Sequence, residues 1–94
     1  MNLKEEIVKA VQLLDETLSR EQKEAFMNQK YDDIYTNHFG LGMWIRNHML
    51  QPDSSLYKVL NSVGMHQTDD MSDLLLRLFY IHLHTKKATR QTRG

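Results

Sequence analysis

The chain has 94 residues, no cysteine, and 12 basic against 12 acidic side chains, a length that fits one domain with a single modest core. Without cysteine it has no disulfide framework, no thiolate zinc site and no cysteine nucleophile. Residues 1–85 carry 8 Lys and Arg against 12 Asp and Glu, and a mildly acidic body argues against a dedicated nucleic-acid domain, whose usual surface is basic.

Hydrophobic periodicity predicts an amphipathic helix at the amino terminus. Its apolar positions recur every three or four residues at Leu3, Ile7, Val11, Leu14 and Leu18. Ser19 and Gln22 have the spacing of a capping box, so a second, short helix is expected to begin at Ser19. We expect this helix to turn Ala25, Phe26 and Met27 inward.

The middle of the chain predicts a central helix preceded by an ambiguous segment. Residues 31–36 fit either a helical turn or a strand, and we predict a helix. Residues 39–50 are apolar nearly all round a helical wheel, which is typical of a mostly buried helix. Inside that helix Gly40 and Gly42 would each cost up to about 1 kcal/mol relative to alanine. Close approach of a neighbouring backbone is their expected reason.

Two further helices follow. Pro52 ends the central helix because it disfavours helical angles in the residue before it, and residues 53–55 are alternative caps for the next helix. The inward stripe of that helix is expected to comprise Leu56, Val59, Leu60 and Val63. Gly64 is expected to end it in the left-handed conformation. Thr68, followed by two acidic residues that suit the helix dipole, is the expected N-cap of the last helix.

The last helix is expected to run to about residue 85. Residues 86–94 carry four basic side chains and nothing apolar larger than alanine, so we expect a disordered tail. The sequence therefore predicts an all-α fold, a small irregular bundle of about five helices in a single domain over residues 1–85, with a short basic carboxy-terminal tail.

Two features bear on where the protein acts. Residues 1–6 carry acidic side chains with no continuous apolar stretch behind them, which argues against a secretory signal. The longest apolar run, residues 74–81, contains Arg77 and is far shorter than the roughly 20 residues of a membrane span. We therefore expect a cytoplasmic protein without a membrane partner.

The segment 38–48 concentrates the side chains with binding chemistry. Trp44 offers a stacking face, Arg46 a planar fork for carboxylate or phosphate, and Asn47 both a donor and an acceptor, which together predict a site for an anionic or nucleotide-like ligand. In the structural alternative, Trp44 lies in the core and Arg46 pairs with a carboxylate. The candidate carboxylates are Asp32, Asp33, Asp69 and Asp70.

Histidine spacing argues against a metal site. No two of the five histidines are four residues apart on one predicted helix; they are His38, His48, His66, His82 and His84. We predict no metal, no cofactor and no catalytic residue. Two alternatives stay open: a small hydrolase or nucleotide-processing enzyme that uses His38 with Asp69 or Asp70, and a nucleic-acid-binding regulator that uses the basic tail, although four charges attract nucleic acid only weakly.

Two motifs resemble those of a known family. Residues 38–47 read His-Phe-Gly-Leu-Gly-Met-Trp-Ile-Arg-Asn, and residues 69–72 read Asp-Asp-Met-Ser. Over about residues 18–84 the chain is similar to a small domain family of unknown function from bacteria and their phages. Residues 48–53 depart from the Trp- and Gly-rich loop of that family. The resemblance implies one polar cluster comprising His38, Arg46, Asn47, Asp69 and Asp70.

Small size, the absence of a catalytic motif, the acidic body and the resemblance favour a non-catalytic binding protein. It is expected to act by stoichiometric capture or inhibition, as immunity, antitoxin and phage anti-defence proteins do. The target is either a protein or a small phosphorylated or nucleotide signal. The expected ligand-binding residues are His38, Trp44, Arg46, Asn47, Asp69 and Asp70. The apolar stripe of the first helix also predicts a homodimer, because a small domain has little area to cover it.

Overall fold

The computed structural model describes the backbone of residues 2–93 and the side chains of residues 2–37 and 40–86. Over that backbone the chain forms six helices and no strand. The helices are α1 (Leu3–Thr17), α2 (Arg20–Met27), the 3-10 helix η1 (Tyr31–Phe39), α3 (Leu41–Met49), α4 (Ser55–Ser62) and α5 (Thr68–Arg93). The expected all-α fold is confirmed, with one helix more than the five predicted.

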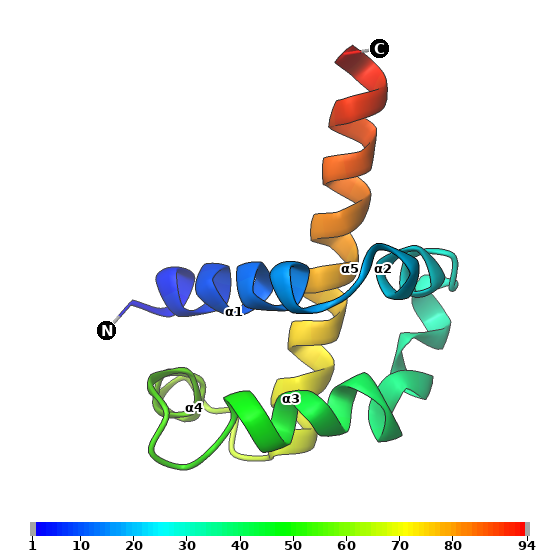
Figure 1. Ribbon diagram of the computed structural model, residues 1–94. Helices are drawn as coiled ribbons and strands as arrows, with labels where there is room; N and C mark the ends of the chain where they lie inside the picture. The colour runs from blue at the N-terminus through cyan, green and yellow to red at the C-terminus, as the bar shows by residue number, and fades with distance from the viewer. Residues whose placement is uncertain (1, 94) are drawn as a thin grey trace.

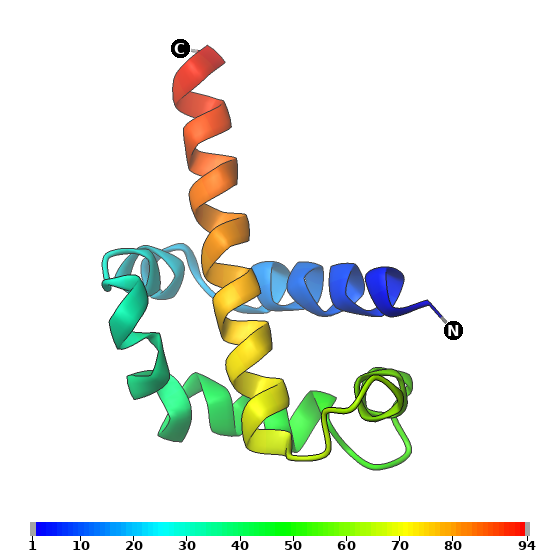
Figure 2. The ribbon, with the colours of Figure 1, turned by 180° about the vertical axis from the view of Figure 1, so that it is seen from behind.

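Helix α5 is the central element of the fold (Figure 1). Helices α1, α2, α3 and η1 all pack against it, and α1 also contacts α4. Helices α1 and α3 cross the same side of α5, one near its middle and one near its start, while the view from behind shows α5 in front of both (Figure 2). Because α5 supports both crossing helices, it fixes how far apart they lie.

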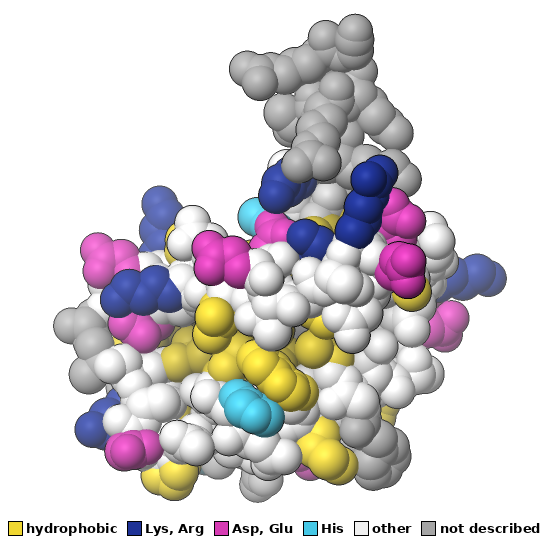
Figure 3. All heavy atoms as spheres, viewed as in Figure 1, with side chains coloured by type: hydrophobic (Ala, Val, Ile, Leu, Met, Phe, Trp, Pro, Cys, Tyr) yellow, Lys and Arg dark blue, Asp and Glu magenta, His cyan; other side chains and the backbone are white. Residues whose placement is uncertain are grey.

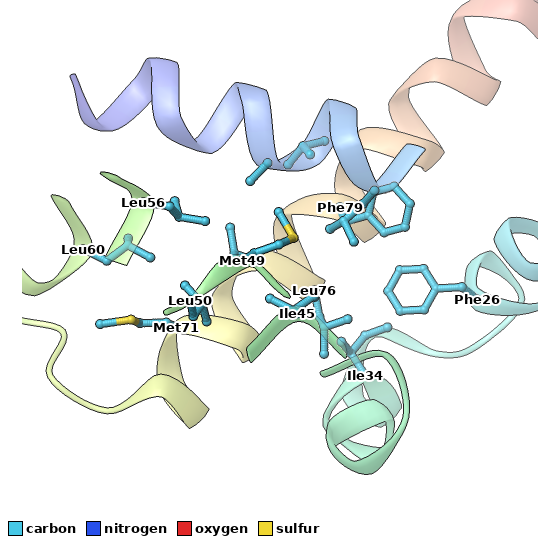
Figure 4. Close-up of a cluster of buried hydrophobic side chains, with 14 of the residues drawn as sticks. Phe26, Ile34, Ile45, Met49, Leu50, Leu56, Leu60, Met71, Leu76 and Phe79 are labelled. Atoms are coloured by element: carbon cyan, nitrogen blue, oxygen red, sulfur yellow. The ribbon is translucent and has the colours of Figure 1, made fainter. Parts of the chain in front are cut away.

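The core lies where the other helices meet α5. Figure 4 shows side chains from α2, η1, α3, α4 and α5 converging there, with Phe79 of α5 facing Phe26 of α2. The rings of this pair are stacked with centroids 5.5 Å apart. The large side chains that are almost wholly buried include Leu14, Ile34, Ile45, Leu60, Met71, Leu75, Leu76 and Phe79. Each contributes about 1.5–3 kcal/mol by leaving water.

Local capping signals define several helix ends as the sequence predicts. Ser19 and Gln22 form the capping box, with the Gln22 backbone N–H donating to Ser19 Oγ at 3.1 Å and the Ser19 N–H donating to Gln22 Oε1 at 2.9 Å. Of the three alternative caps before α4, Ser54 is the one used, because its hydroxyl accepts from the Tyr57 N–H at 3.1 Å. Gly64 has a φ of 99° and ends α4 in the left-handed region.

Some sequence-based expectations were wrong in detail. Gly40 separates the end of η1 from α3, so the central helix begins at Leu41 and residues 31–39 form a single 3-10 helix. Ala25 is exposed, since α2 turns mainly its Phe26 face to α5. Val63 is 56% exposed because it is the C-cap of α4, where the helical period no longer applies.

Helix α5 differs from the expected last helix at both ends. Thr68 is its first helical residue rather than the N-cap, and the Met71 N–H donates to the Gln67 carbonyl at 3.1 Å. The helix continues past residue 85 to Arg93. The side chains of residues 87–94 lie outside the described residues, so the expectation that they add nothing to the core stays a prediction. In the described part of the chain, no helix combines the length and apolarity needed to cross a bilayer.

Candidate functional site

A polar cluster around Arg46 joins α3 to the first turns of α5. Arg46 Nη1 donates to Ser72 Oγ at 3.0 Å, and Nε lies 3.5 Å from Asp69 Oδ1. The Ser72 hydroxyl in turn donates to the Asp69 carbonyl at 3.0 Å. The Arg46 side chain is 14% exposed and Asp69 is 60% exposed, so the pair lies at the edge of the core. Arg46 therefore does reach a carboxylate of α5, as the structural alternative expects.

Close packing at Gly42 places the Arg46 head group. A Cβ atom added at Gly42 would lie 3.1 Å from the Asn37 carbonyl oxygen and 3.3 Å from Arg46 Nη1. The expected reason for this glycine, close approach by a neighbouring backbone, is therefore correct. The Arg46 guanidinium thus lies between the Gly42 backbone of α3 and the Ser72 and Asp69 side chains of α5. It acts as a structural link between the two helices, since a partly buried charge is stable only when it is paired.

The other residues of the expected cluster do not join Arg46 in this way. Asn47 is exposed, and its carbonyl accepts from the Gln51 side chain at 3.3 Å. Asp70 is exposed and forms no hydrogen bond or ion pair with a described residue. The His38 side chain lies outside the described residues. Among those residues, no three histidine, aspartate or glutamate side chains gather as metal ligands would.

Trp44 points to another side of α3, where it stacks on His48. The two rings lie 4.6 Å apart between centroids at an interplanar angle of 16°. His48 Nδ1 is 2.9 Å from the Trp44 carbonyl oxygen, a hydrogen bond that requires a proton on Nδ1. The half-buried indole is thus fixed in orientation. Trp44 and Arg46, expected in one site, face different surroundings.

A groove lies between α1, the start of α2 and the start of α3. Its volume is about 330 Å³, and its lining comprises Leu14, Thr17, Leu18, Gln22, Gly40, Leu41 and Trp44. Figure 3 shows hydrophobic side chains gathered between α1 and α3, with a histidine beside them. Ligand pockets are typically concave and mostly apolar, with volumes from about 300 Å³ upward. We call this feature the α1–α3 groove.

Three of the residues that line the α1–α3 groove carry polar side-chain groups, namely Thr17, Gln22 and Trp44. The Gln22 side chain is used in the capping box of α2. The Thr17 hydroxyl and the Trp44 indole N–H form no hydrogen bond with a described residue. The groove therefore combines aliphatic and aromatic side chains with two residues, Thr17 and Trp44, whose side-chain polar groups have no partner among the described residues.

An ion-pair cluster centred on Asp15, which sequence reasoning missed, holds two walls of the groove. Asp15 Oδ1 accepts from Lys23 Nζ at 2.7 Å, while Oδ2 accepts from His82 Nε2 at 3.0 Å and Lys86 Nζ at 3.2 Å. The hydrogen bond from Lys23, followed by those from His82 and Lys86, holds the pKa of the Asp15 carboxyl well below its ordinary 3.8, against the opposing effect of burial. The cluster ties the end of α1 and the start of α2 to α5.

A family model matches residues 5–83, which is most of the chain. The chain belongs to DUF6794, a domain of unknown function. The expected membership of a family of unknown function is therefore confirmed. The DUF6794 match includes every residue that lines the groove and the whole Arg46 cluster. Among curated proteins and among solved structures, nothing matches the chain.

Proposed function

We propose that this DUF6794 protein is a non-catalytic binding protein that captures a target protein stoichiometrically through the α1–α3 groove. The observation that carries the proposal is the groove itself, with its aliphatic side chains and the fixed indole of Trp44. Immunity, antitoxin and phage anti-defence proteins act in this manner, and we propose that class of role, exercised in the cytoplasm.

The polar cluster gives less support to a small phosphorylated or nucleotide ligand. Arg46, the residue best suited to hold a phosphate, already lies against Ser72 and Asp69. The hydrolase alternative loses support for a similar reason, since Asp69 lies beside a cation and Asp70 is exposed and does not line the groove. Lys86, at the start of the basic tail, pairs with Asp15, which weakens the nucleic-acid alternative.

We also propose that the groove face contributes to self-association. Leu13 lies one helical turn before Thr17 on α1, so the two are neighbours on the helix surface. Leu13 is 45% exposed and extends the apolar surface beyond the groove. A homodimer formed through this face would compete with target capture, and native mass spectrometry at several protein concentrations measures it.

The test of capture uses a pair of variants on α1. Thr17→Arg places a long charged side chain at the groove wall, in the last turn of α1 where a cation suits the helix dipole. Gln12→Arg is the matched control, because five residues along a helix turn the side chain by about 140°. Gln12 is also exposed, so neither change disturbs the core.

Each protein is used as bait in a lysate of the native host, and the complex is then weighed by native mass spectrometry. We expect the unchanged protein and Gln12→Arg to retain one target at fixed stoichiometry, and Thr17→Arg to lose it. Trp44 is the only tryptophan, so its emission reports binding at the groove directly. Equal retention by Thr17→Arg, or release of a chemically altered target, would refute the proposal.

A further inference from the structure

We infer that two copies of the chain pair through the outer face of α5, with their α5 helices antiparallel and Leu74 near the two-fold axis. The occupant of this face is therefore a second copy of the same chain. The inference does not depend on the proposed function, because the residues that line the α1–α3 groove include none from α5. Three observations carry it: an uncovered helix face, a row of apolar side chains along it, and two opposite charges beside that row.

The outer face of α5 is the side turned away from α1 and α3. Both helices cross the same side of α5, and Figure 2 draws no described helix in front of the other side. Phe79 is almost wholly buried, and Ile81, two residues further on and so about 200° round the helix, is 51% exposed. Leu74 is related in the same way to the buried Leu76 and is half-buried. The side of α5 opposite the core therefore carries apolar side chains that the described fold leaves partly in water.

These side chains form a row with the spacing of a helix–helix seam. Leu74, Leu78 and Ile81 follow one another at intervals of four and three residues. Apolar positions that alternate in this way stay on the side of a helix that faces a second helix. Helix α5 has 26 residues, which at 1.5 Å per residue is about 39 Å, so the row lies on an element long enough to pair with a copy of itself.

Two opposite charges beside the row determine the direction of pairing. Asp70 and Arg77 are seven residues, or about two helical turns, apart, so they lie on one side of α5 with Leu74 between them. In an antiparallel pair about Leu74, Asp70 of each copy lies level with Arg77 of the other. A parallel pair would leave the two charges about 10 Å apart along the helix axis. Charge complementarity therefore favours the antiparallel pair.

Both charges have capacity for a further partner. Asp70 is exposed and forms no hydrogen bond or ion pair with a described residue. Arg77 Nε donates to Asp73 Oδ2 at 2.9 Å and Nη1 lies 3.5 Å from the Tyr31 carbonyl oxygen, while Nη2 has no partner among the described residues. Because Asp73 already neutralises part of this charge and exposed ion pairs contribute only about 0–1 kcal/mol each, the ion pairs set the direction and the apolar row supplies the affinity.

The same arrangement accounts for exposed apolar side chains just before α5. Ile81 lies seven residues after Leu74, so in an antiparallel pair it reaches the loop that precedes α5 in the second copy. That loop contains Val63, which is 56% exposed, and the half-buried Met65. Ile81 of one copy thus meets apolar side chains of the other at both ends of the pair, and each contact removes surface of both copies from water.

The experiment measures the dissociation constant of the dimer by analytical ultracentrifugation of the full chain from micromolar to millimolar concentration. We expect a monomer–dimer equilibrium that Ile81→Lys weakens at least tenfold. Leu13→Lys is the matched control, because Leu13 is an exposed apolar residue of similar accessibility on α1, and it should leave the dissociation constant unchanged. Circular dichroism checks that each variant is folded.

Charge variants test the direction of pairing. Asp70→Arg should weaken the dimer about three- to tenfold at low salt and less at high salt, while the exposed control Asp53→Arg should not. An equimolar mixture of Asp70→Arg and Arg77→Glu should form a heterodimer more tightly than either variant pairs with itself, because both ion pairs are then restored.

Three results would overturn the inference. The first is a chain that stays monomeric at every concentration, and the second is a dimer that Ile81→Lys leaves intact, including one that Leu13→Lys dissociates instead. The third is a dimer that responds to Ile81→Lys but not to Asp70→Arg, which would refute the antiparallel pairing about Leu74. None of these results bears on target capture, which the Thr17→Arg comparison tests separately.

Discussion

Gly42→Ala sets two well-defined effects against each other. Gly42 is the second residue of α3, where alanine is favoured over glycine by at most about 1 kcal/mol because it loses less backbone entropy on folding. The added Cβ, however, would lie 3.1 Å from the Asn37 carbonyl oxygen, 3.3 Å from Arg46 Nη1 and 3.6 Å from Leu76 Cδ1. The outcome depends on whether these atoms move aside.

Hydrogen bonds hold the two nearest atoms in place. The Asn37 carbonyl accepts from the Gly40 N–H at 3.1 Å, and the Asn37 side chain donates to the Ile34 carbonyl at 2.8 Å. Arg46 Nη1 donates to Ser72 at 3.0 Å. Overpacking at a site that does not relax costs about 1–3 kcal/mol. After the propensity gain, we expect Gly42→Ala to lower the free energy of unfolding by about 1 kcal/mol.

Urea and thermal unfolding followed by circular dichroism measure this change, and 1 kcal/mol corresponds to about 4–8 °C in Tm for a domain of this size. Arg46→Met, which removes the guanidinium, completes a double-mutant cycle with Gly42→Ala. Because one of the close contacts is then gone, the double variant should lose less than the sum of the single losses, by about 0.5 kcal/mol or more. A Gly42→Ala protein about 1 kcal/mol more stable than the unchanged chain would refute the described packing of η1 and Arg46 on α3.

Two further predictions concern the Asp15 cluster and the end of α4. Asp15→Asn should cost about 1–3 kcal/mol at pH 7, because hydrogen bonds to a charged acceptor are lost. Since the folded pKa of Asp15 lies below 3.8, this loss of unfolding free energy should be full above that pH and shrink as the pH falls below it. Urea unfolding at pH 7 and pH 3 measures the loss. An equal loss at both pH values would contradict the cluster. Gly64→Ala should cost about 1–2 kcal/mol in thermal unfolding, because the φ of 99° strains any L side chain. Gly64→Asn should lose less stability, because asparagine tolerates the left-handed region. Equal losses in the two variants would argue against the left-handed turn.

Local signals in the sequence were enough to predict most of the helices. The capping pair Ser19 and Gln22 and the terminating Gly64 act within a few residues of chain, so their spacing alone identifies them. Val63 is a counterexample. It continues the apolar spacing of α4 in the sequence, but α4 has already ended, so the spacing no longer predicts burial. The length of the 3-10 helix η1 was also missed, since its residues carry competing helix and strand preferences.

The candidate site was less accessible to sequence reasoning, because it depends on tertiary contacts. The approach of Arg46 to a carboxylate of α5 was anticipated from the chemistry of a partly buried charge. The Asp15 cluster was not, since its partners are up to 71 positions away and none carries a local signal. Leu14 and Leu18 belong to the predicted apolar stripe of α1, and only the position of Leu41 and Trp44 opposite them creates a groove.

The place of α5 in the fold has a consequence for how the chain acquires its structure during synthesis. Helices α1, α2, η1 and α3 all precede α5, yet each of them packs against it. The apolar faces of these helices therefore lack their main partner until residues 71–83, which contain five fully buried α5 side chains, have emerged from the ribosome. Completion of the core thus waits for α5, and a chain made only as far as α3 exposes hydrophobic surface that chaperones recognise.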